Sequence, residues 1–404
     1  MGCMRSGLKT ALRIAFGIAF VCAAFALTEY SARKIIYGRL ARPSGQTELI
    51  LDRWAAFRNN PRYNRNGVRL NTAGFRRDED VAIDKPPNTI RIFLLGGSVA
   101  YGGDGLYPEI DDHWTIANSE TIDRDLEKRL NSTFPSRRWE VINAAVKGYF
   151  LNQDLALYLS ALRRYRPDYL ILLDGVNDIF AILRSSQGQD GYNMAGLGDE
   201  FNSLTKPGSM SLRFMISTWL LDNSALYRWI RESSAQRYRT RDRTKRAKAS
   251  IASTHPDVGD LKLDEQLQYR AAAGRLETYL HQVQQIHNLA LLDGTKTLFV
   301  LQPQIAVTRK PLTDVESQLF EYWSKLDGRL AVYGFQALYP QLSAVLSSGA
   351  HAEGYRFLDL TNVFDRASTQ AFTDYCHLTP SGNQLVADAI FDSVSSWARQ
   401  GGDR

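Results

Sequence analysis

Five apolar runs follow one another from residue 89 to the C-terminus, separated by longer helical stretches. They cover residues 89–96 (TIRIFLLG), 139–144 (WEVINA), 169–174 (YLILLD), 297–302 (TLFVLQ) and 355–360 (YRFLDL). Their apolar positions are continuous, which indicates strands buried on both faces, as in a parallel sheet with helices on each side. Helices are expected at residues 120–130, 152–164, 263–292 and 381–399, the last capped by Ser381. The alternation of strands and helices predicts a doubly wound α/β fold.

Two stretches do not fit this alternation. About 120 residues separate the third run from the fourth, far more than an ordinary connection, which predicts an insertion at 183–262. Residues 31–88 are polar and rich in Arg and Asn, and we expect a stalk and an irregular lead-in there. The predicted organisation is therefore an N-terminal segment at 1–30, the lead-in at 31–88, and one domain at 89–404 that carries a helical, basic insertion.

The N-terminal segment has the pattern of an export signal. Arg5, Lys9 and Arg13 precede the uncharged run 14–27. That run is shorter than the roughly 20 residues of a full membrane span, but apolar neighbours and a snorkelling Arg13 extend it. Ala24-Phe25-Ala26 also fits a cleavage site. An uncleaved membrane anchor, a cleaved signal and a buried helix all remain open; either signal would place the rest of the chain outside the cytoplasm, anchored or secreted.

Composition excludes several classes of protein. The chain has 404 residues, of which 44% are hydrophobic and 23% charged, so it is neither collagen-like nor mostly disordered. Three cysteines do not make a disulfide scaffold, and we expect Cys376 to be a free thiol. CxxC, HxxxH and HExxH spacings are absent, so no metal or other cofactor is expected.

The net charge of +6 is concentrated in one segment. Residues 228–248 hold nine Arg or Lys against two acids, which leaves the remainder close to neutral. Such runs occur in nucleic-acid-binding arms, but an exported protein rarely meets nucleic acid, so none is expected as a partner. Contact with anionic lipid or acidic polysaccharide through Arg237, Arg239, Arg241 and Arg243 suits the location better. A solvated helical face with no partner is the alternative.

A glycine-rich turn closes the first strand at Gly96-Gly97-Ser98. A phosphate-binding loop would need Lys and a hydroxyl where Gly103 and Asp104 stand, and the dinucleotide pattern GxGxxG is absent. The remaining use of such a turn is to place a serine at the carboxyl end of a strand. Ser98 is therefore the candidate nucleophile.

A nucleophilic serine needs a base, and six histidines are available. His377 alone lies in an informative place, on a loop between the last strand and the last helix, and Asp374 three residues earlier can orient its imidazole. Negative charge that develops on a substrate oxygen needs hydrogen-bond donors. Gly148 after the second strand and Asn177 after the third can supply an N–H each.

These four blocks, in this order, resemble the SGNH hydrolase superfamily of GDSL-type esterases and lipases. The matching residues are Ser98, Gly148, Gly175-Val176-Asn177-Asp178 and Asp374-x-x-His377. The resemblance spans about 290 residues, from Arg91 to Val386, apart from the insertion. The family's usual Gly-Asp-Ser reads Gly96-Gly97-Ser98 here, which departs from the pattern at a residue outside the triad.

The resemblance implies a flavodoxin-like α/β/α sandwich with a parallel sheet of about five strands. It also implies a Ser98–His377–Asp374 triad and an oxyanion hole formed by the Ser98 N–H, the Gly148 N–H and Asn177. The predicted activity is hydrolysis of a carboxylic ester of a small molecule, lipid or glycan. Two alternatives remain open: an O-acyltransferase acting on an envelope polysaccharide, and a catalytically silent envelope-binding module.

Overall fold

A computed structural model describes residues 2–37, 48–184 and 261–400, apart from 62, 66, 108, 109 and 112–114, with isolated residues at 216–230 and 259. The chain divides into two compact units. One comprises Met1–Thr47 and Asp199–Thr244, and the other comprises Glu48–Gly198 and Lys245–Arg404. The predicted insertion at 183–262, including Arg237, Arg239, Arg241 and Arg243, lies almost wholly outside the described residues.

The smaller unit contains helix α1, Gly2–Tyr37. Its segment Ala15–Lys34 is long and apolar enough to cross a membrane, with a mean hydropathy of 1.5. Side chains such as Phe16 and Leu27 are exposed along it. The predicted apolar helix is therefore present, and both a membrane anchor and a signal sequence have these properties.

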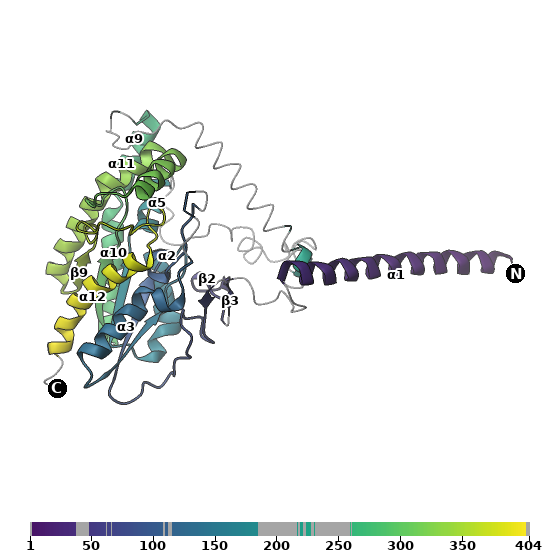
Figure 1. The fold of residues 1–404 in the computed structure, drawn as a ribbon, viewed down its shortest axis with the longest axis horizontal. Helices are drawn as coiled ribbons and strands as arrows, with labels where there is room; N and C mark the ends of the chain where they lie inside the picture. The colour runs from purple at the N-terminus through teal and green to yellow at the C-terminus, as the bar shows by residue number, and fades with distance from the viewer. Residues whose placement is uncertain are drawn as a thin grey trace. The chain divides into compact units, whose positions relative to one another are not determined.

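The larger unit, which contains the blue to yellow elements of Figure 1, is built on a five-stranded parallel sheet in the order β6-β5-β7-β8-β9. Its strands are β5 Thr89–Gly96, β6 Arg138–Asn143, β7 Tyr169–Asp174, β8 Lys296–Leu301 and β9 Arg356–Asp359. Each strand coincides with one of the five apolar runs. Every residue of β5 and β7 is buried, which accounts for their unbroken apolar sequences.

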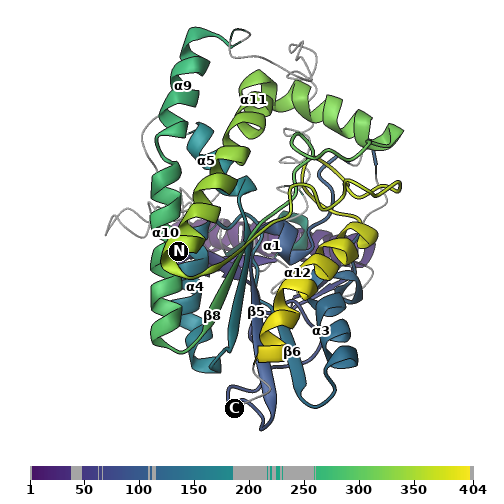
Figure 2. The same ribbon diagram turned by 90° about the vertical axis from the view of Figure 1, so that its left-hand side faces the viewer.

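Helices cover both faces of the sheet, as Figure 2 shows: α3 and α12 on one face, α4 and α10 on the other. The bounds are α3 Ile122–Thr133, α4 Leu151–Leu157, α5 Val176–Arg184, α10 Leu276–Leu292 and α12 Pro380–Gln400. The predicted three-layer, flavodoxin-like α/β/α fold is confirmed. The strand that follows β5 in the chain, β6, is placed on one side of β5, and the later strands β7, β8 and β9 are placed on the other. The strand order therefore reverses at β5. The carboxyl end of β5 is thus where such folds form their binding crevice.

The predicted set of helices needs three corrections. The helix expected at 263–292 is two helices, α9 Leu263–Ala273 and α10, separated at Gly274 and Arg275. The element α11, Asp314–Glu353, was not predicted; it consists of two helices joined at a kink, where Gly328 (φ 80°) has a non-helical backbone. The last helix begins at Pro380, and its cap is Thr379, whose Oγ1 accepts the N–H of Gly382 at 3.1 Å.

The C-terminal part of the lead-in is folded onto the larger unit. It contains the antiparallel pairs β1 Leu49–Asp52 with β2 Ala56–Asn59, and β3 Asn64–Arg65 with β4 Val68–Arg69. The first pair is fixed to the loop after β6, because the Tyr149 hydroxyl donates to the Phe57 carbonyl at 2.5 Å. Gln153 Nε2 donates to the Ala55 carbonyl at 2.7 Å. This hairpin therefore braces the segment that carries Gly148.

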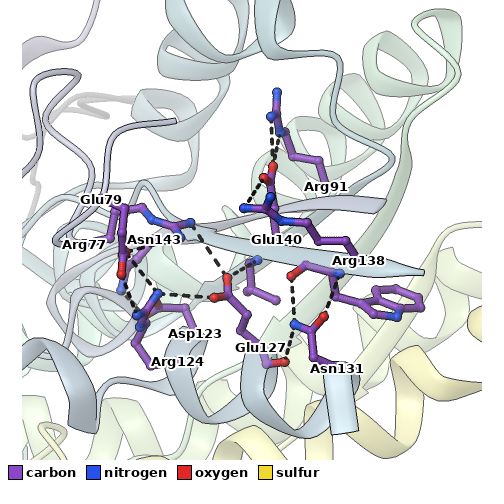
Figure 3. Close-up of polar contacts among 12 residues, drawn as sticks. Arg77, Glu79, Arg91, Asp123, Arg124, Glu127, Asn131, Arg138, Glu140 and Asn143 are labelled. Atoms are coloured by element: carbon purple, nitrogen blue, oxygen red, sulfur yellow. Dashed lines mark hydrogen bonds and ion pairs between the residues drawn. The ribbon is translucent and has the colours of Figure 1, made fainter. Parts of the chain in front are cut away.

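A polar network fixes α3 to β6 (Figure 3). Glu127 Oε2 accepts the Val141 N–H at 2.8 Å, and Asn131 exchanges two hydrogen bonds with the backbone of Trp139. At the end of β6, Asn143 Nδ2 donates to Asp123 Oδ1 at 2.8 Å and to the Ala100 carbonyl at 2.9 Å. Ala100 belongs to α2, Ser98–Tyr101, the short helix that begins with the candidate nucleophile. The network thus ties the second strand to the start of the candidate site.

Candidate active site

The turn Gly96-Gly97-Ser98, here called the nucleophile turn, fits only because its first two residues lack side chains. Gly96 has φ +131°, and a Cβ there would lie 2.2 Å from the Leu173 carbonyl oxygen. A Cβ on Gly97 would lie 2.5 Å from Asn177 Nδ2. The strand can therefore pass directly into α2 beside β7, and Ser98 stands at the first position of that helix.

The far end of α2 is held by a buried arginine. The helix ends at Gly102 in the left-handed region, and Arg76 Nη1 donates to the carbonyls of Tyr101 (2.8 Å) and Gly102 (2.5 Å). Arg76 is fully buried, so these carbonyls replace water as the hydrogen-bond acceptors of its charged guanidinium group. The role of Arg76 could not be predicted, because an arginine in a polar segment carries no signal of burial.

The structure brings Ser98, His377 and Asp374 together in one hydrogen-bonded chain. Ser98 Oγ lies 2.7 Å from His377 Nε2, and His377 Nδ1 lies 2.6 Å from Asp374 Oδ2. Both distances are within the range expected of a nucleophile, its base and the group that orients the base. His377 is 4% exposed and Asp374 fully buried, so water does not compete for these bonds.

Asp374 is surrounded by donors. Its Oδ1 accepts the backbone N–H groups of Cys376 and His377, both at 2.8 Å, and its Oδ2 also accepts the Leu106 N–H at 2.9 Å. Burial alone would raise the pKa of Asp374, but the nearby His377 and these hydrogen bonds outweigh it and hold the pKa below its ordinary value. Asp374 is therefore a carboxylate that can fix the imidazole with its proton on Nδ1.

A buried ion pair anchors the loop that carries His377. Lys310 Nζ lies 2.7 Å from Glu316 Oε2, and both side chains are fully buried. Glu316 Oε1 accepts the N–H groups of Ala371 and Phe372 at 2.9 and 3.2 Å. Glu316 thus joins the first turn of α11 to the segment just before Asp374. This pair could not be predicted, because two charged residues six apart are typical of a solvated surface.

Glycines of the loop after α2 let that loop lie against the histidine. A Cβ on Gly103 would stand 3.0 Å from His377 Cδ2, and one on Gly105 would stand 2.9 Å from the Thr373 carbonyl oxygen. The same loop supplies the Leu106 N–H that reaches Asp374. The loop therefore packs on both His377 and its partner.

The two candidate oxyanion donors lie on neighbouring segments. Asn177 is the second residue of α5, and its Nδ2 donates to the Tyr149 carbonyl at 2.9 Å. Gly148, with φ +82°, occupies the turn that the Tyr149 N–H closes on the Val146 carbonyl at 3.1 Å. The close approach of Asn177 Nδ2 to Gly97 places this amide immediately beside the nucleophile turn.

The atoms of Asp374, Cys376 and His377 that could ligate a metal lie within 4.8 Å of one another. Cys376 is a buried free cysteine, and burial raises the pKa of its thiol well above the ordinary value. A metal ligand needs the thiolate. Both ring nitrogens of His377 are also engaged, one by Asp374 and one by Ser98. This donor set does not fit a metal site.

The remaining described histidines lie elsewhere. His287 is buried with its Nδ1 2.7 Å from Thr297 Oγ1, while His281 and His351 are on the surface. His113 and His255 are outside the described residues.

No protein-family model and no curated protein matches the chain. Among solved structures, it is similar to LAE5, an α/β hydrolase enzyme from the metagenome of Lake Arreo, with 13% identity over 76% of this chain and 95% of that one, at a TM-score of 0.37. It is similar to the acetyl xylan esterase AlAXEase with 11% identity over 76% and 100% of the two chains, at a TM-score of 0.39. The acetylxylan esterase Axe2 from Geobacillus stearothermophilus gives 10% identity over 76% and 94%, at a TM-score of 0.36. These activities belong to those enzymes.

Proposed function

We propose that the protein is a serine esterase of the SGNH type, in which Ser98 attacks the carbonyl carbon of a carboxylic ester. The observation that carries the proposal is the continuous chain from Ser98 Oγ through the imidazole of His377 to Asp374, with separations of 2.7 and 2.6 Å. An ionised, buried acid behind the histidine is the arrangement that a general base needs.

In the proposed mechanism His377 Nε2 takes the proton of Ser98 as its oxygen bonds to the substrate carbon. Asp374 stabilises the imidazolium, which then protonates the departing alcohol. Water, activated by the same imidazole, attacks the acyl-enzyme and releases the acid. Every proton moves through His377 Nε2, and the triad ends as it began.

The oxyanion formed on the carbonyl oxygen needs donors that are already in place. We assign the Ser98 N–H, the Gly148 N–H and one N–H of Asn177. A carboxamide has two N–H groups, and Asn177 uses one to donate to the Tyr149 carbonyl. That bond fixes the amide plane while the second N–H serves the substrate. A single such donor is worth roughly 10²–10³ in kcat.

The place of action that we propose is outside the cytoplasm, on a membrane-anchored protein that is released if α1 is cleaved. This rests on the basic N-terminal residues and the apolar segment Ala15–Lys34. We further propose that Arg237, Arg239, Arg241 and Arg243 contact anionic lipid or acidic polysaccharide. Replacing all four with Gln should spare turnover of a small soluble ester and weaken binding to anionic vesicles at low salt; unchanged binding refutes the contact.

The test of the function is turnover of p-nitrophenyl acetate and longer p-nitrophenyl esters by the wild type and by Ser98→Ala, with and without an oligosaccharide acceptor. Hydrolysis that disappears in Ser98→Ala supports the esterase. Acyl transfer to the oligosaccharide in preference to water identifies an O-acyltransferase that uses the same triad. A folded wild-type protein with no turnover of any ester supports the binding module and overturns the proposal.

A further inference from the structure

Three buried carboxyl groups lie beneath the nucleophile turn, outside the proposed mechanism. Asp154 is on α4, Asp174 ends β7 and Asp178 is on α5, and their exposed fractions are 0%, 3% and 6%. Asp154 Oδ1 accepts the Gly96 N–H at 3.1 Å. The Gly97 N–H lies beside Asp174 and lowers the pKa of that carboxyl. The acids thus adjoin the two backbone N–H groups that immediately precede Ser98.

The carboxyl groups of Asp154 and Asp174 adjoin each other, and each alters the pKa of the other. Two carboxylates cannot share a hydrogen bond, because each is an acceptor only. Within the described residues, Oδ2 of Asp154 and Oδ2 of Asp174 receive no N–H or O–H from any other group. One proton held between the two acids satisfies both oxygens.

The surroundings favour retention of that proton. The titratable groups that act on the pair are Asp178 on α5, Tyr279 on α10 and Tyr339 on α11, both tyrosines being fully buried. Among the described residues no Lys or Arg forms an ion pair with any of the three acids. Burial raises the pKa of Asp154 to about 8 and that of Asp178 to about 6, and holds the pKa of Asp174 well above its ordinary value.

We propose that Asp154 and Asp174 are positioning residues that share one proton and hold the Gly96 and Gly97 N–H groups, so that Ser98 stays aligned with His377. The inference rests on the proposed function of Ser98 as nucleophile. Loss of the proton to solvent leaves two adjacent buried carboxylates with no cation between them. Their repulsion separates the acids and releases the turn, so the pair sets an alkaline limit on kcat.

The direction in which kcat changes with pH follows from the requirement that the pair of acids keep its shared proton. Asp154 ionises first, at a pKa of about 8, and the one proton that the pair then shares stays with Asp174 until the pH rises through the still higher pKa of that residue. In the wild type kcat should therefore fall only above about pH 8, approaching tenfold per pH unit, as for loss of one essential proton. KM should change little, because neither acid contacts the substrate in the proposed mechanism.

The experiment compares kcat between pH 6 and pH 10 for the wild type, Asp154→Asn and Asp154→Ala, with the surface variant Asp392→Asn as a matched control. The Asn side chain is permanently neutral, accepts the Gly96 N–H and donates to Asp174. Asp154→Asn should retain kcat near neutral pH within about threefold and lose the alkaline decline. Asp154→Ala should lower kcat at every pH by about tenfold, roughly one hydrogen bond, with KM unchanged.

A second measurement, the infrared carbonyl band of a protonated carboxylic acid, does not depend on activity. The wild type at pH 7 should show intensity in this band that is missing from Asp154→Asn. An alkaline decline that is equal in the wild type and Asp154→Asn overturns the proposal while leaving the esterase intact. Should Asp154→Asn fail to fold, absence of the band from the wild type at pH 7 overturns it equally. If no ester is turned over, the esterase fails and the infrared comparison alone decides whether the shared proton exists.

Discussion

Replacement of Asp374 by Asn tests the orientation of the base in detail. The carboxylate accepts four hydrogen bonds, two on each oxygen. A carboxamide has one acceptor oxygen, so the Asn side chain can adopt one of two orientations, with that oxygen at the position of Oδ1 or of Oδ2. With the oxygen at Oδ2 it would keep His377 Nδ1 but aim its NH₂ at two backbone N–H groups only 2.8 Å away. With the oxygen at Oδ1 it keeps those two bonds and leaves the Leu106 N–H without an acceptor.

The energies decide between the two orientations. Each buried N–H left unsatisfied costs about 1–3 kcal/mol, so the first orientation loses about 2–6 kcal/mol and the second about 1–3 kcal/mol. The second orientation should prevail, and its NH₂ then donates to His377 Nδ1. The imidazole proton moves to Nε2, which faces Ser98 Oγ and can no longer accept a proton from it. By analogy with the serine proteases we expect kcat to fall by about 10⁴, or about 5.4 kcal/mol of activation free energy.

The assay is kcat for p-nitrophenyl acetate at pH 7–8, together with the urea midpoint of unfolding. Asp374→Asn should remain folded, less stable by about 1–3 kcal/mol, while its kcat drops about 10⁴-fold. The control Asp392→Asn lies on the exposed side of α12 and should change neither quantity. A folded Asp374→Asn variant that retains a tenth or more of the wild-type kcat would refute the assignment of Asp374.

Two further predictions concern the nucleophile turn and its supports. Gly97→Ala would place a Cβ 2.5 Å from Asn177 Nδ2, so it should displace the amide and lower kcat roughly 10²–10³-fold with less effect on KM; an unchanged kcat would remove Asn177 from the oxyanion hole. The raised pKa values of Asp154 and Asp178 mean that the folded protein retains protons which the unfolded chain releases above about pH 4. Their contribution to stability is therefore complete below pH 4 and is lost as the pH rises towards 8, by about 1.4 kcal/mol per pH unit for each proton retained. Urea unfolding at pH 5, 6, 7 and 8 measures the free energy of unfolding. With rising pH this free energy should fall less, or rise more, in Asp154→Asn than in the wild type, and parallel curves would contradict this.

Much of the fold could be predicted because its signals are local. Strands β5, β6 and β7 are short apolar runs that end in a glycine or a polar residue, and burial on both faces leaves no other pattern. The candidate residues Ser98, Asn177 and His377 each follow a strand directly or precede a helix, so the topology alone directs them to one edge of the sheet.

The parts that could not be predicted depend on contacts between distant segments. Arg76, Lys310 and Glu316 are charged residues in polar stretches, and only the folded chain shows that carbonyls or opposite charges surround them. The paired acids Asp154 and Asp174 come from different elements, so their shared proton has no signature in either segment. Element α11 was missed for a different reason: its kink at Gly328 divides the periodicity that would have marked a long helix.

The central claim, that Ser98 is the nucleophile activated by His377, is tested most directly by covalent labelling with a fluorophosphonate. The reagent forms a stable adduct with an activated serine, and peptide mass spectrometry locates it. The account predicts one adduct, on the peptide that contains Ser98, which is absent from Ser98→Ala and formed far more slowly by His377→Ala. Labelling of folded Ser98→Ala at the wild-type rate, or an adduct on another residue, would contradict it.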